Sequence, residues 1–220
     1  MAVKITPGML LRAYSVGLFP MAESADHPSL HWIEPERRGV FPLDHFHVPR
    51  SLAKQVRRRD FEIRIDTAFD AVIRACAEAR PERASTWINS TICSLYNELF
   101  SLGFCHSVEC WKDGELVGGL YGVSIGAAFF GESMFSRESG ASKVALVHLV
   151  ARMKAGGYQL LDAQFVNPHL KQFGCVEMAQ EDYKLLLEDA LQVEADFTQF
   201  RGDENPDLVL AAAGFPRSRE

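Results

Sequence analysis

Polar side chains that could carry out chemistry stand at the ends of two apolar segments of this sequence. Glu132 follows the apolar residues 127–130, and Asp162 and Gln164 close the segment that begins at Tyr158. Because alternate residues of a strand point to the same side, Asp162 and Gln164 are predicted to share a face. A buried carboxylate is costly unless it is paired or hydrogen-bonded, so Glu132 and Asp162 need partners or a chemical task. Two structural acids held in an ion-pair network are the alternative interpretation.

The composition is that of a folded, mildly acidic protein. Hydrophobic residues make up 47% of the 220 residues, which excludes general disorder, and the formal net charge is -6. Proteins that bind nucleic acid over a whole surface are usually basic, so any RNA contact is expected at a local patch. We expect no membrane span and no signal peptide. The scattered cysteines include no C-x-x-C pair and favour a reduced, cytoplasmic protein: Cys76, Cys93, Cys105, Cys110 and Cys175.

The hydrophobic periodicity predicts a regular pattern of elements that would position the polar side chains. Thr6, followed by proline, starts a helix that Gly17 ends. A long helix over residues 142–155 separates the two segments that carry the polar side chains. The other predicted elements are strands at 31–33, 39–43, 61–65, 106–111, 116–123, 127–132 and 158–164, and helices at 51–59, 69–76, 89–99, 167–173 and 181–191.

This order of elements predicts the α/β class, with helices on the faces of a mixed α+β sheet. The pattern becomes regular near Asp60. We therefore expect a small N-terminal α+β domain over residues 1–60 and a larger domain over residues 61–195. After residue 195 the periodicity fades into charged and helix-breaking residues, so residues 196–220 are expected to form a loose tail.

Most of the sequence from Tyr14 to Tyr183 resembles the leucyl/phenylalanyl-tRNA–protein transferases. Residues 32–39 resemble the Trp-x-x-Pro-x-x-Arg-Gly stretch of that family, and residues 131–136 and 161–164 resemble its two motifs around the polar side chains. Further matching segments follow in the family's order: residues 13–21, 47–52, 86–88, 106–109, 117–123 and 141–143, then His169 and Gly174. So many ordered segments are far more specific than a single short motif.

The resemblance implies an aminoacyltransferase that moves Leu or Phe, with Met as a further donor, from aminoacyl-tRNA to the N-terminal Arg or Lys of acceptor proteins. Its products are marked for N-degron-dependent degradation. The resemblance also implies an acetyltransferase-like (GNAT-type) fold for residues 61–195. No cofactor and no metal are expected, and we expect a cytoplasmic monomer without a membrane partner.

The reaction that the family carries out is the attack of an amine on an already activated ester. It demands positioning and proton management rather than a serine or cysteine nucleophile. The resemblance assigns Asp162 and Gln164 to catalysis, with the carboxylate working through the amide to polarise the amine. Glu132 fits two roles that the sequence leaves open. It could hold the cationic acceptor by charge-assisted hydrogen bonds, or it could contact the terminal adenosine of the tRNA.

An apolar pocket for the donor side chain is predicted between the strands and the long helix. For any one of its residues, ordinary core packing is the more frequent role. The family is nevertheless similar in having an apolar pocket built from these elements. The predicted lining residues are Leu120, Phe129, Leu146, Leu149, Met153 and Leu161.

Two kinds of residue are candidates for binding the tRNA. Trp32 and Trp87 lie in family-like segments and are predicted to stack on the terminal adenosine, because single-stranded ends are read by aromatic side chains. A basic helix is predicted to hold tRNA phosphate, although such charge runs are often only solvated faces. Its cations are Lys54, Arg57, Arg58 and Arg59.

The sequence differs from the family at two places, and two other functions are alternatives to the transferase interpretation. Ala163 stands where the family often has cysteine, and residues 176–180 lack the usual Pro-Arg. An acyl-CoA-dependent N-acyltransferase is the alternative enzyme, because Gly140 precedes a helix whose N-terminus could receive a diphosphate. A non-catalytic module that binds the end of tRNA is the third interpretation, and it would not need Asp162 or Gln164.

Overall fold

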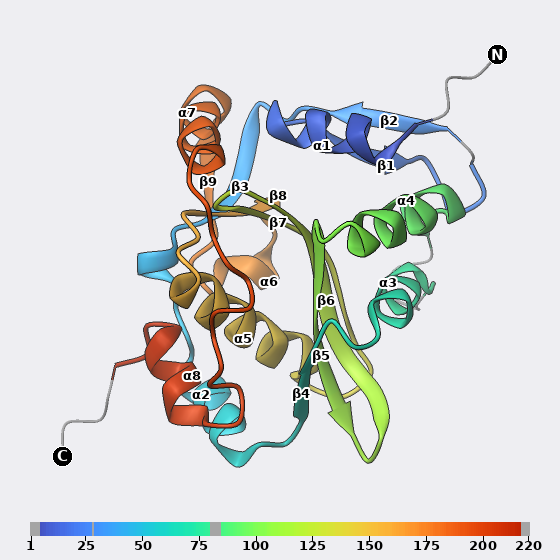
Figure 1. Cartoon of the computed structure of the whole chain (residues 1–220). Coiled ribbons are helices and arrows are strands. Elements are labelled where there is room, and N and C mark those ends of the chain that lie inside the picture. The colour runs from blue at the N-terminus through green and yellow to red at the C-terminus, as the bar shows by residue number, and fades with distance from the viewer. Residues whose placement is uncertain (1–4, 28, 80–84, 217–220) are drawn as a thin grey trace.

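The amino-terminal part of this computed structural model combines one helix with a two-stranded hairpin (Figure 1). The structure describes residues 5–27, 29–79 and 85–216. Helix α1 (Pro7–Ser15) begins as the sequence predicts, because the Thr6 hydroxyl oxygen accepts a hydrogen bond from the Met9 N–H. Gly17, with φ 86°, ends it. Strands β1 (Phe19–Ala22) and β2 (Leu30–Ile33) are antiparallel, with Pro20 opposite Trp32.

A mixed sheet organises the rest of the chain. Among the described residues it has seven strands in the order β4–β5–β6–β7–β8–β3–β9, and only the neighbours β7 and β8 run parallel. The predicted mixed α/β architecture is confirmed. A parallel pair needs a crossover, which helix α5 (Ala141–Ala155) supplies. The strands are β3 (Arg37–Phe41), β4 (Glu62–Ile65), β5 (Cys105–Lys112), β6 (Glu115–Ile125), β7 (Ala128–Ser136), β8 (Leu160–Gln164) and β9 (Val176–Ala179).

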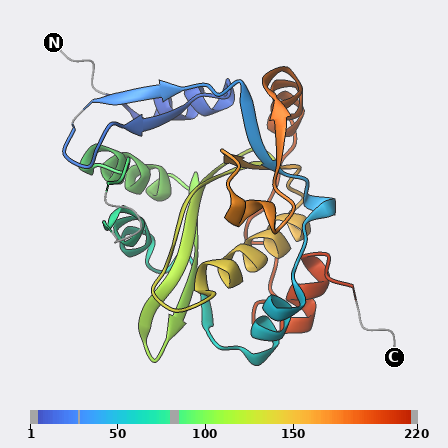
Figure 2. The same cartoon turned by 180° about the vertical axis from the view of Figure 1, so that it is seen from behind.

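Helices cover both faces of the sheet, as the two opposite views show (Figures 1 and 2). Helices α3 (Phe69–Ala77) and α4 (Ser90–Ser101) lie on one side, with α3 packed on β5, β6 and β7. On the other side, α5 packs on the sheet and is itself covered by α2 (Arg50–Arg58) and α8 (Pro206–Ala212). Consequently α5 is buried along most of its length. The remaining helical segments are η1 (Leu43–His45), α6 (Pro168–Lys171) and α7 (Gln180–Leu191).

Two segments differ from the expected division of the chain. Strand β3 comes from the first 60 residues but lies in the large sheet, between β8 and β9, so the topology favours a division near residue 36 over one near Asp60. Residues 196–216, expected as a loose tail, contain α8, whose Val209 and Leu210 are buried. Strands β1 and β9, of four residues each, were not predicted.

The sheet opens at the carboxyl ends of β7 and β8. The two strands pair over three residues each, starting at Ala128 and Leu160, and then separate. On its other edge, β7 holds one residue more than β6 between Gly131 and Ser133, so Glu132 lies in a β-bulge. A bulge changes the direction of the side chains that follow it. Side chains of β7 and side chains of β8 can therefore point into the same space at this point of the sheet.

Candidate active site

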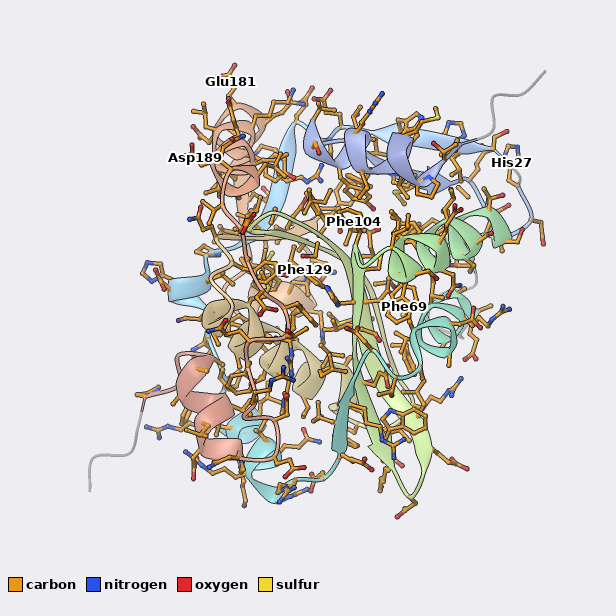
Figure 3. All side chains as sticks on the ribbon, in the orientation of Figure 1. His27, Phe69, Phe104, Phe129, Glu181 and Asp189 are labelled. Carbon is orange, nitrogen blue, oxygen red and sulfur yellow. The ribbon has the colours of Figure 1, made fainter. Side chains whose placement is uncertain are left out.

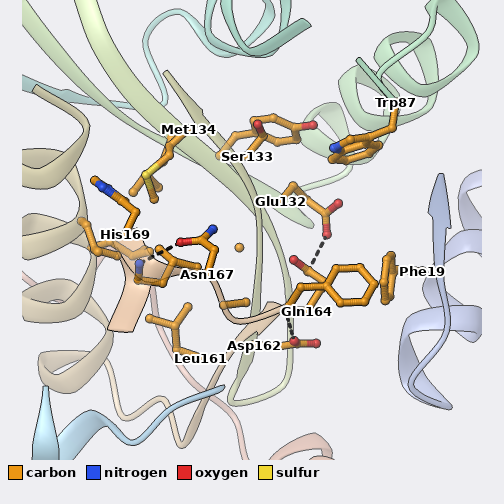
Figure 4. A pocket seen from close by; sticks show the side chains of 18 of the residues that line it. Phe19, Trp87, Glu132, Ser133, Met134, Leu161, Asp162, Gln164, Asn167 and His169 are labelled. Atoms are coloured by element: carbon orange, nitrogen blue, oxygen red, sulfur yellow. Dashed lines mark hydrogen bonds between the residues drawn. The ribbon is translucent and has the colours of Figure 1, made fainter. Parts of the chain in front are cut away.

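A cavity of about 430 Å³ lies where β7 and β8 separate (Figure 4). Glu132, Asp162 and Gln164 lie together on one side of it, and Met134 and Leu161 lie on the other. A cavity of this size, apolar apart from a few convergent polar groups, is typical of a small-molecule site. The lining residues are Phe19, Met21, Trp87, Leu120, Tyr121, Gly131, Glu132, Ser133, Met134, Leu146, Leu149, Leu161, Asp162, Ala163, Gln164, Phe165, Asn167, His169 and Leu170.

Glu132 is the centre of a buried hydrogen-bond cluster. Its carboxylate accepts hydrogen bonds from the hydroxyls of Tyr14 (2.6 Å) and Tyr96 (3.1 Å) and from the side-chain amide of Gln164 (3.4 Å). The two tyrosine hydroxyls also contact each other. Burial raises the pKa of Glu132 from 4.5 to about 7, although the hydrogen bonds from Tyr14 and Tyr96 act in the opposite direction. This carboxyl can therefore gain or lose a proton near neutral pH.

Asp162 belongs to a second, separate cluster. It is fully buried, and its carboxylate accepts two-pronged hydrogen bonds from Arg38, at 3.0 Å from Nε and 2.6 Å from Nη2. It also accepts a bond of 2.8 Å from the Tyr183 hydroxyl and one of 2.8 Å from the backbone N–H of Gln164. The carboxylate that contacts the side-chain amide of Gln164 is thus Glu132, whereas Asp162 holds its backbone. These hydrogen bonds differ from the expected arrangement, in which Asp162 works through that amide, and the catalytic roles of Asp162 and Gln164 stay a prediction.

Gln164 leaves the strand in an unusual backbone conformation. Its φ is 55°, in the left-handed region that residues other than glycine rarely occupy. The Phe165 N–H donates to the Ala163 carbonyl at 2.6 Å, which closes a three-residue turn centred on Gln164. Strained residues of this kind persist only where their surroundings fix them, and they are frequent at functional sites. The prediction that Asp162 and Gln164 share a face assumed a continuous strand, and the alternation of the strand ends at this turn.

The sequences of known proteins match this chain over both the hairpin and the sheet. The family model "Leucyl/phenylalanyl-tRNA protein transferase N-terminal domain" matches residues 4–36, and "Leucyl/phenylalanyl-tRNA protein transferase" matches residues 40–188. The chain belongs to this family. The second match includes β7 and β8, which carry Glu132, Asp162 and Gln164.

Two relatives of the transferase are similar over nearly their whole length. The leucyl/phenylalanyl-tRNA–protein transferase of Paramagnetospirillum magneticum is 60% identical over 88% of this chain and 92% of its own length. That of Nitrobacter winogradskyi is 58% identical over 88% of this chain and 86% of its own. A solved structure of a functionally unknown conserved protein from Staphylococcus epidermidis covers 81% of this chain and 66% of its own, at 14% identity. Its TM-score is 0.40.

The apolar wall of the transferase cavity comes from β6, β8 and α5. Of the predicted pocket residues, Leu120, Leu146, Leu149 and Leu161 line the cavity, whereas Phe129 and Met153 do not. Phe129 instead lies deep in the core (Figure 3), stacked on Phe197 at 5.6 Å between ring centroids. Met153 is buried in the same core cluster. Both side chains are fully buried, so they fill the core instead of bordering the cavity.

The two tryptophans predicted for the tRNA end lie in different places. Trp87 lines the cavity, and Figure 4 shows it on the same side as Phe19. Trp32 lies on β2, 38% exposed, and is not among the lining residues. Its hairpin partner strand β1 reaches the cavity instead, through Phe19 and Met21. Trp32 was predicted because it lies in a family-like segment, and such a likeness does not place a side chain relative to the cavity.

The basic helix of the transferase is α2. Its four cations are all exposed, but two of them have acidic partners: Arg57 with Asp207 at 3.0 Å, and Arg58 with Asp60 at 2.6 Å. Figures 1 and 2 both place α2 at the end of the molecule opposite the β1–β2 hairpin. Lys54 lies on α2, and Arg59, with φ 54°, ends the helix.

Several residues of the site were missed by sequence reasoning. Arg38 had a signal, because it is the arginine of the Trp-x-x-Pro-x-x-Arg-Gly stretch. No such signal marked the three tyrosines, because a tyrosine in the apolar pattern of a helix is usually a core residue. They are Tyr14, Tyr96 and Tyr183. No cluster of three or more His, Cys, Asp or Glu side chains that could bind a metal occurs in the described part of the chain. None of the helices described has the length and apolar character needed to cross a membrane.

Proposed function

We propose that the transferase moves Leu or Phe from aminoacyl-tRNA to the N-terminal Arg or Lys of an acceptor protein, and that the cavity between β7 and β8 is where the two substrates meet. Membership of the family carries the reaction type, transfer of an aminoacyl group from tRNA to protein. The observation that carries the location is the buried pair of Glu132 and Gln164 at one side of an apolar cavity.

The donor side chain occupies the apolar wall. Leu120, Leu146, Leu149 and Leu161 offer hydrocarbon surface and no charge, which suits the side chain of Leu or Phe. The four residues come from three elements that are all fixed in the core, so the pocket is largely formed before the donor binds.

The acceptor amine lies at the polar end. Glu132, with its pKa raised to about 7 by burial, is matched to an α-amino group, which ordinarily titrates at roughly 7.7–8.0. The amine nitrogen attacks the ester carbonyl carbon, a C–N bond forms, and the bond from that carbon to the ribose oxygen breaks. Glu132 accepts the proton that the nitrogen loses and passes a proton to the departing ribose oxygen, so its carboxylate is regenerated. Gln164 bridges Glu132 and the reacting centre.

The end of the tRNA enters past the β1–β2 hairpin. Trp87 provides a stacking surface for the terminal adenosine, and Met21 and Phe19 border the same cavity. Helix α2 holds the phosphate backbone farther along the tRNA, with Lys54 and Arg59 as its cations besides the two arginines already paired with acids. Glu132 is thereby given the acceptor role rather than an adenosine contact.

We further propose an acetyltransferase-like fold, a cytoplasmic location and a monomeric state. A parallel pair joined by one crossover helix, opening into a cavity, supports an acetyltransferase-like fold for the large sheet. All five cysteines are free thiols, which fits the reducing cytoplasm, where aminoacyl-tRNA is made. We propose a monomer, because the described residues of one chain line the whole cavity.

Incubation with charged tRNA tests the proposal. Leucyl-tRNA and an Arg-initiated peptide are expected to give a peptide one leucine longer, while an acyl-CoA in a parallel reaction gives none. A peptide beginning with Ala serves as the acceptor control and is expected to remain unchanged. Transfer from acyl-CoA but not from tRNA would favour the alternative enzyme. Binding of tRNA without any product would favour the non-catalytic module.

A further inference from the structure

The carboxylate of Asp162 has no free side, although it borders the cavity. One oxygen accepts from the Gln164 N–H at 2.8 Å and from Arg38 Nε at 3.0 Å. The other accepts from Arg38 Nη2 at 2.6 Å and from the Tyr183 hydroxyl at 2.8 Å. The exposed fraction of Asp162 is 0%. A carboxylate with this many donors around it is strongly held in one geometry and offers no open lone pair to a substrate.

Arg38 is itself fixed by contacts from three directions. Its Nη1 donates to the Gly17 carbonyl at 2.7 Å, just after α1. Its guanidinium carbon lies 4.7 Å from the ring centroid of Phe19 and 4.6 Å from that of Tyr183. Such a planar, stacked and forked arrangement is specific to arginine. It ties the amino-terminal helix and β1 to β8 and α7.

The neighbouring glycine makes room for the turn that Asp162 holds. A Cβ on Gly39 would lie 2.8 Å from the backbone carbonyl carbon of Phe165, closer than real Cβ atoms come. The pairing of β3 with β8 also shifts register between Gly39 and Val40, beside Gln164. Arg38 and Gly39 therefore stabilise the same turn of the chain. Arg38 binds Asp162, and the missing side chain of Gly39 leaves space for the turn that follows Asp162.

We propose that Arg38 and Tyr183 are positioning residues of the transfer reaction. They hold Asp162 on the Gln164 N–H and so maintain the left-handed turn that directs the Gln164 side chain to Glu132. Asp162 is a fixed anchor, and proton transfer passes through Glu132. The kinetic part of this inference rests on the proposed transfer reaction, whereas the conformational part does not.

A double-mutant cycle between Tyr183 and Gln164 tests the kinetic part. Tyr183→Phe removes one hydrogen bond but keeps the ring against Arg38, and is expected to lower kcat about tenfold with little change in KM for aminoacyl-tRNA. In a Gln164→Ala background the same substitution is expected to change kcat less than about twofold, because the side chain it positions is gone. Equal losses in both backgrounds would show that Tyr183 acts elsewhere and would overturn the inference.

A matched tyrosine provides the control. Tyr158 is buried, and its hydroxyl bonds Ser124 at 2.7 Å, outside the cavity lining. Tyr158→Phe is expected to leave kcat unchanged. Arg38→Lys, which keeps the charge but cannot bond both carboxylate oxygens and the Gly17 carbonyl, is expected to reduce kcat more than Tyr183→Phe does. A loss with Tyr158→Phe as large as with Tyr183→Phe would reduce the effect to general destabilisation.

Hydrogen exchange measured by NMR tests the conformational part without any substrate. The Gln164 amide proton is expected to exchange about tenfold faster in Tyr183→Phe than in the unmodified protein, and unchanged in Tyr158→Phe. Unaltered exchange in Tyr183→Phe would overturn the inference even if transfer is observed. Absence of transfer by the unmodified protein would instead overturn the proposed function, and the exchange result would still decide whether Arg38 and Tyr183 hold the turn.

Discussion

The molecule contains two arginine–aspartate pairs of similar construction, one beside the cavity and one between α5 and the carboxyl-terminal segment. In the site, Arg38 binds Asp162, donates to a backbone carbonyl and lies between two aromatic rings. In the other pair, Arg152 of α5 binds Asp203, donates to the carbonyls of Phe197 and Phe200, and lies over both of their rings.

The two pairs differ in what they hold. Asp162 has no exposed surface and fixes a strained turn at a cavity, whereas the Asp203 side chain is 19% exposed and joins the carboxyl-terminal segment to α5. His148, also on α5, adds a bond of 3.0 Å to Asp203. Among the described residues Arg152 Nε has no hydrogen-bond partner, while Arg38 Nε donates to Asp162. The same ionic chemistry thus positions a reactive side chain in one place and attaches a segment in the other.

Removing the carboxylate of the Arg152–Asp203 pair is expected to give the largest change in stability. Asp203→Ala leaves Arg152 buried without its partner, which costs about 3 kcal/mol of the free energy of unfolding. At a temperature well below the midpoint of thermal unfolding, the transfer rate should be unchanged, because neither Arg152 nor Asp203 lines the cavity. Urea unfolding and the transfer assay measure the two effects. Loss of transfer in the folded variant would contradict the view that the Arg152–Asp203 pair only attaches the carboxyl-terminal segment.

The acids of the two regions are expected to affect stability with opposite dependence on pH. Glu132 titrates near 4.5 when unfolded and at about 7 when folded, so the folded state holds the extra proton between these values. The free energy of unfolding should therefore fall by up to about 3 kcal/mol as pH rises from 4.5 to 7. Unfolding measured across this range should lose that slope in Glu132→Gln. An identical slope in the variant would contradict the raised pKa.

Asp203 provides the opposite sign for that comparison. Burial would raise its pKa, but the hydrogen bond from His148 and the charge of Arg152 outweigh burial and lower it below the ordinary 3.8. Its stabilisation is therefore complete above 3.8 and is lost as pH falls through the lower, folded value. Asp203→Asn should weaken the protein at neutral pH and leave the decline between 4.5 and 7 in place.

Within the site, Gln164→Ala is expected to reduce kcat by roughly 100-fold, a typical loss for a preorganised polar group at a reacting centre. The fold should be retained, because the buried Asp162 cluster bonds the backbone of Gln164 and not its side chain. Gln159→Ala, at an exposed position just before β8, is the matched control and should transfer normally. Kinetics with charged tRNA and an Arg-initiated peptide decide the matter. Comparable rates for the two variants would remove Gln164 from the mechanism.

The apolar wall should show a smaller effect, on choice of donor. Leu149→Trp narrows the cavity and is expected to discriminate against Phe relative to Leu by about tenfold in kcat/KM, within the range for a change of a few methylenes. Competition between the two charged tRNAs measures the ratio. An unchanged ratio would place the donor side chain elsewhere.

The smallest effect is expected at α2, which contributes no residue to the lining of the cavity between β7 and β8. Replacing Lys54, Arg57, Arg58 and Arg59 with alanine should weaken tRNA binding a few-fold and flatten its dependence on salt, since each lost phosphate contact reduces the slope by about 0.9. Arg57 and Arg58 already have acidic partners, so fewer than four contacts are expected. Transfer from a minimal aminoacyl-adenosine donor should be untouched, whereas Trp87→Ala should impair both donors. Equal losses for the basic variant on both donors would make the helix structural.

Most of the elements could be predicted from the sequence, because caps, turns and periodicity are local; β1, β9 and α8 were not predicted. The Thr6 cap, the Asn89 cap and the long helix before β8 are examples. The place of β3 could not be predicted, because it enters the large sheet between strands that come much later in the chain. Phe129 and Met153 were placed in the pocket for the same reason, since periodicity gives the face of a residue but not where along that face a cavity opens.

The family, the two acids and the amide proposed for the site, and the apolar helix beside them could be identified from the sequence alone, because these are properties of residues close together in the chain. Only the tertiary structure decided the partners: Glu132 with Tyr14, Tyr96 and Gln164, and Asp162 with Arg38 and Tyr183. Those contacts join segments more than 20 residues apart, and a bulge and a single left-handed residue direct them. Side-chain direction at such points depends on the packing of the whole sheet, which no local pattern contains.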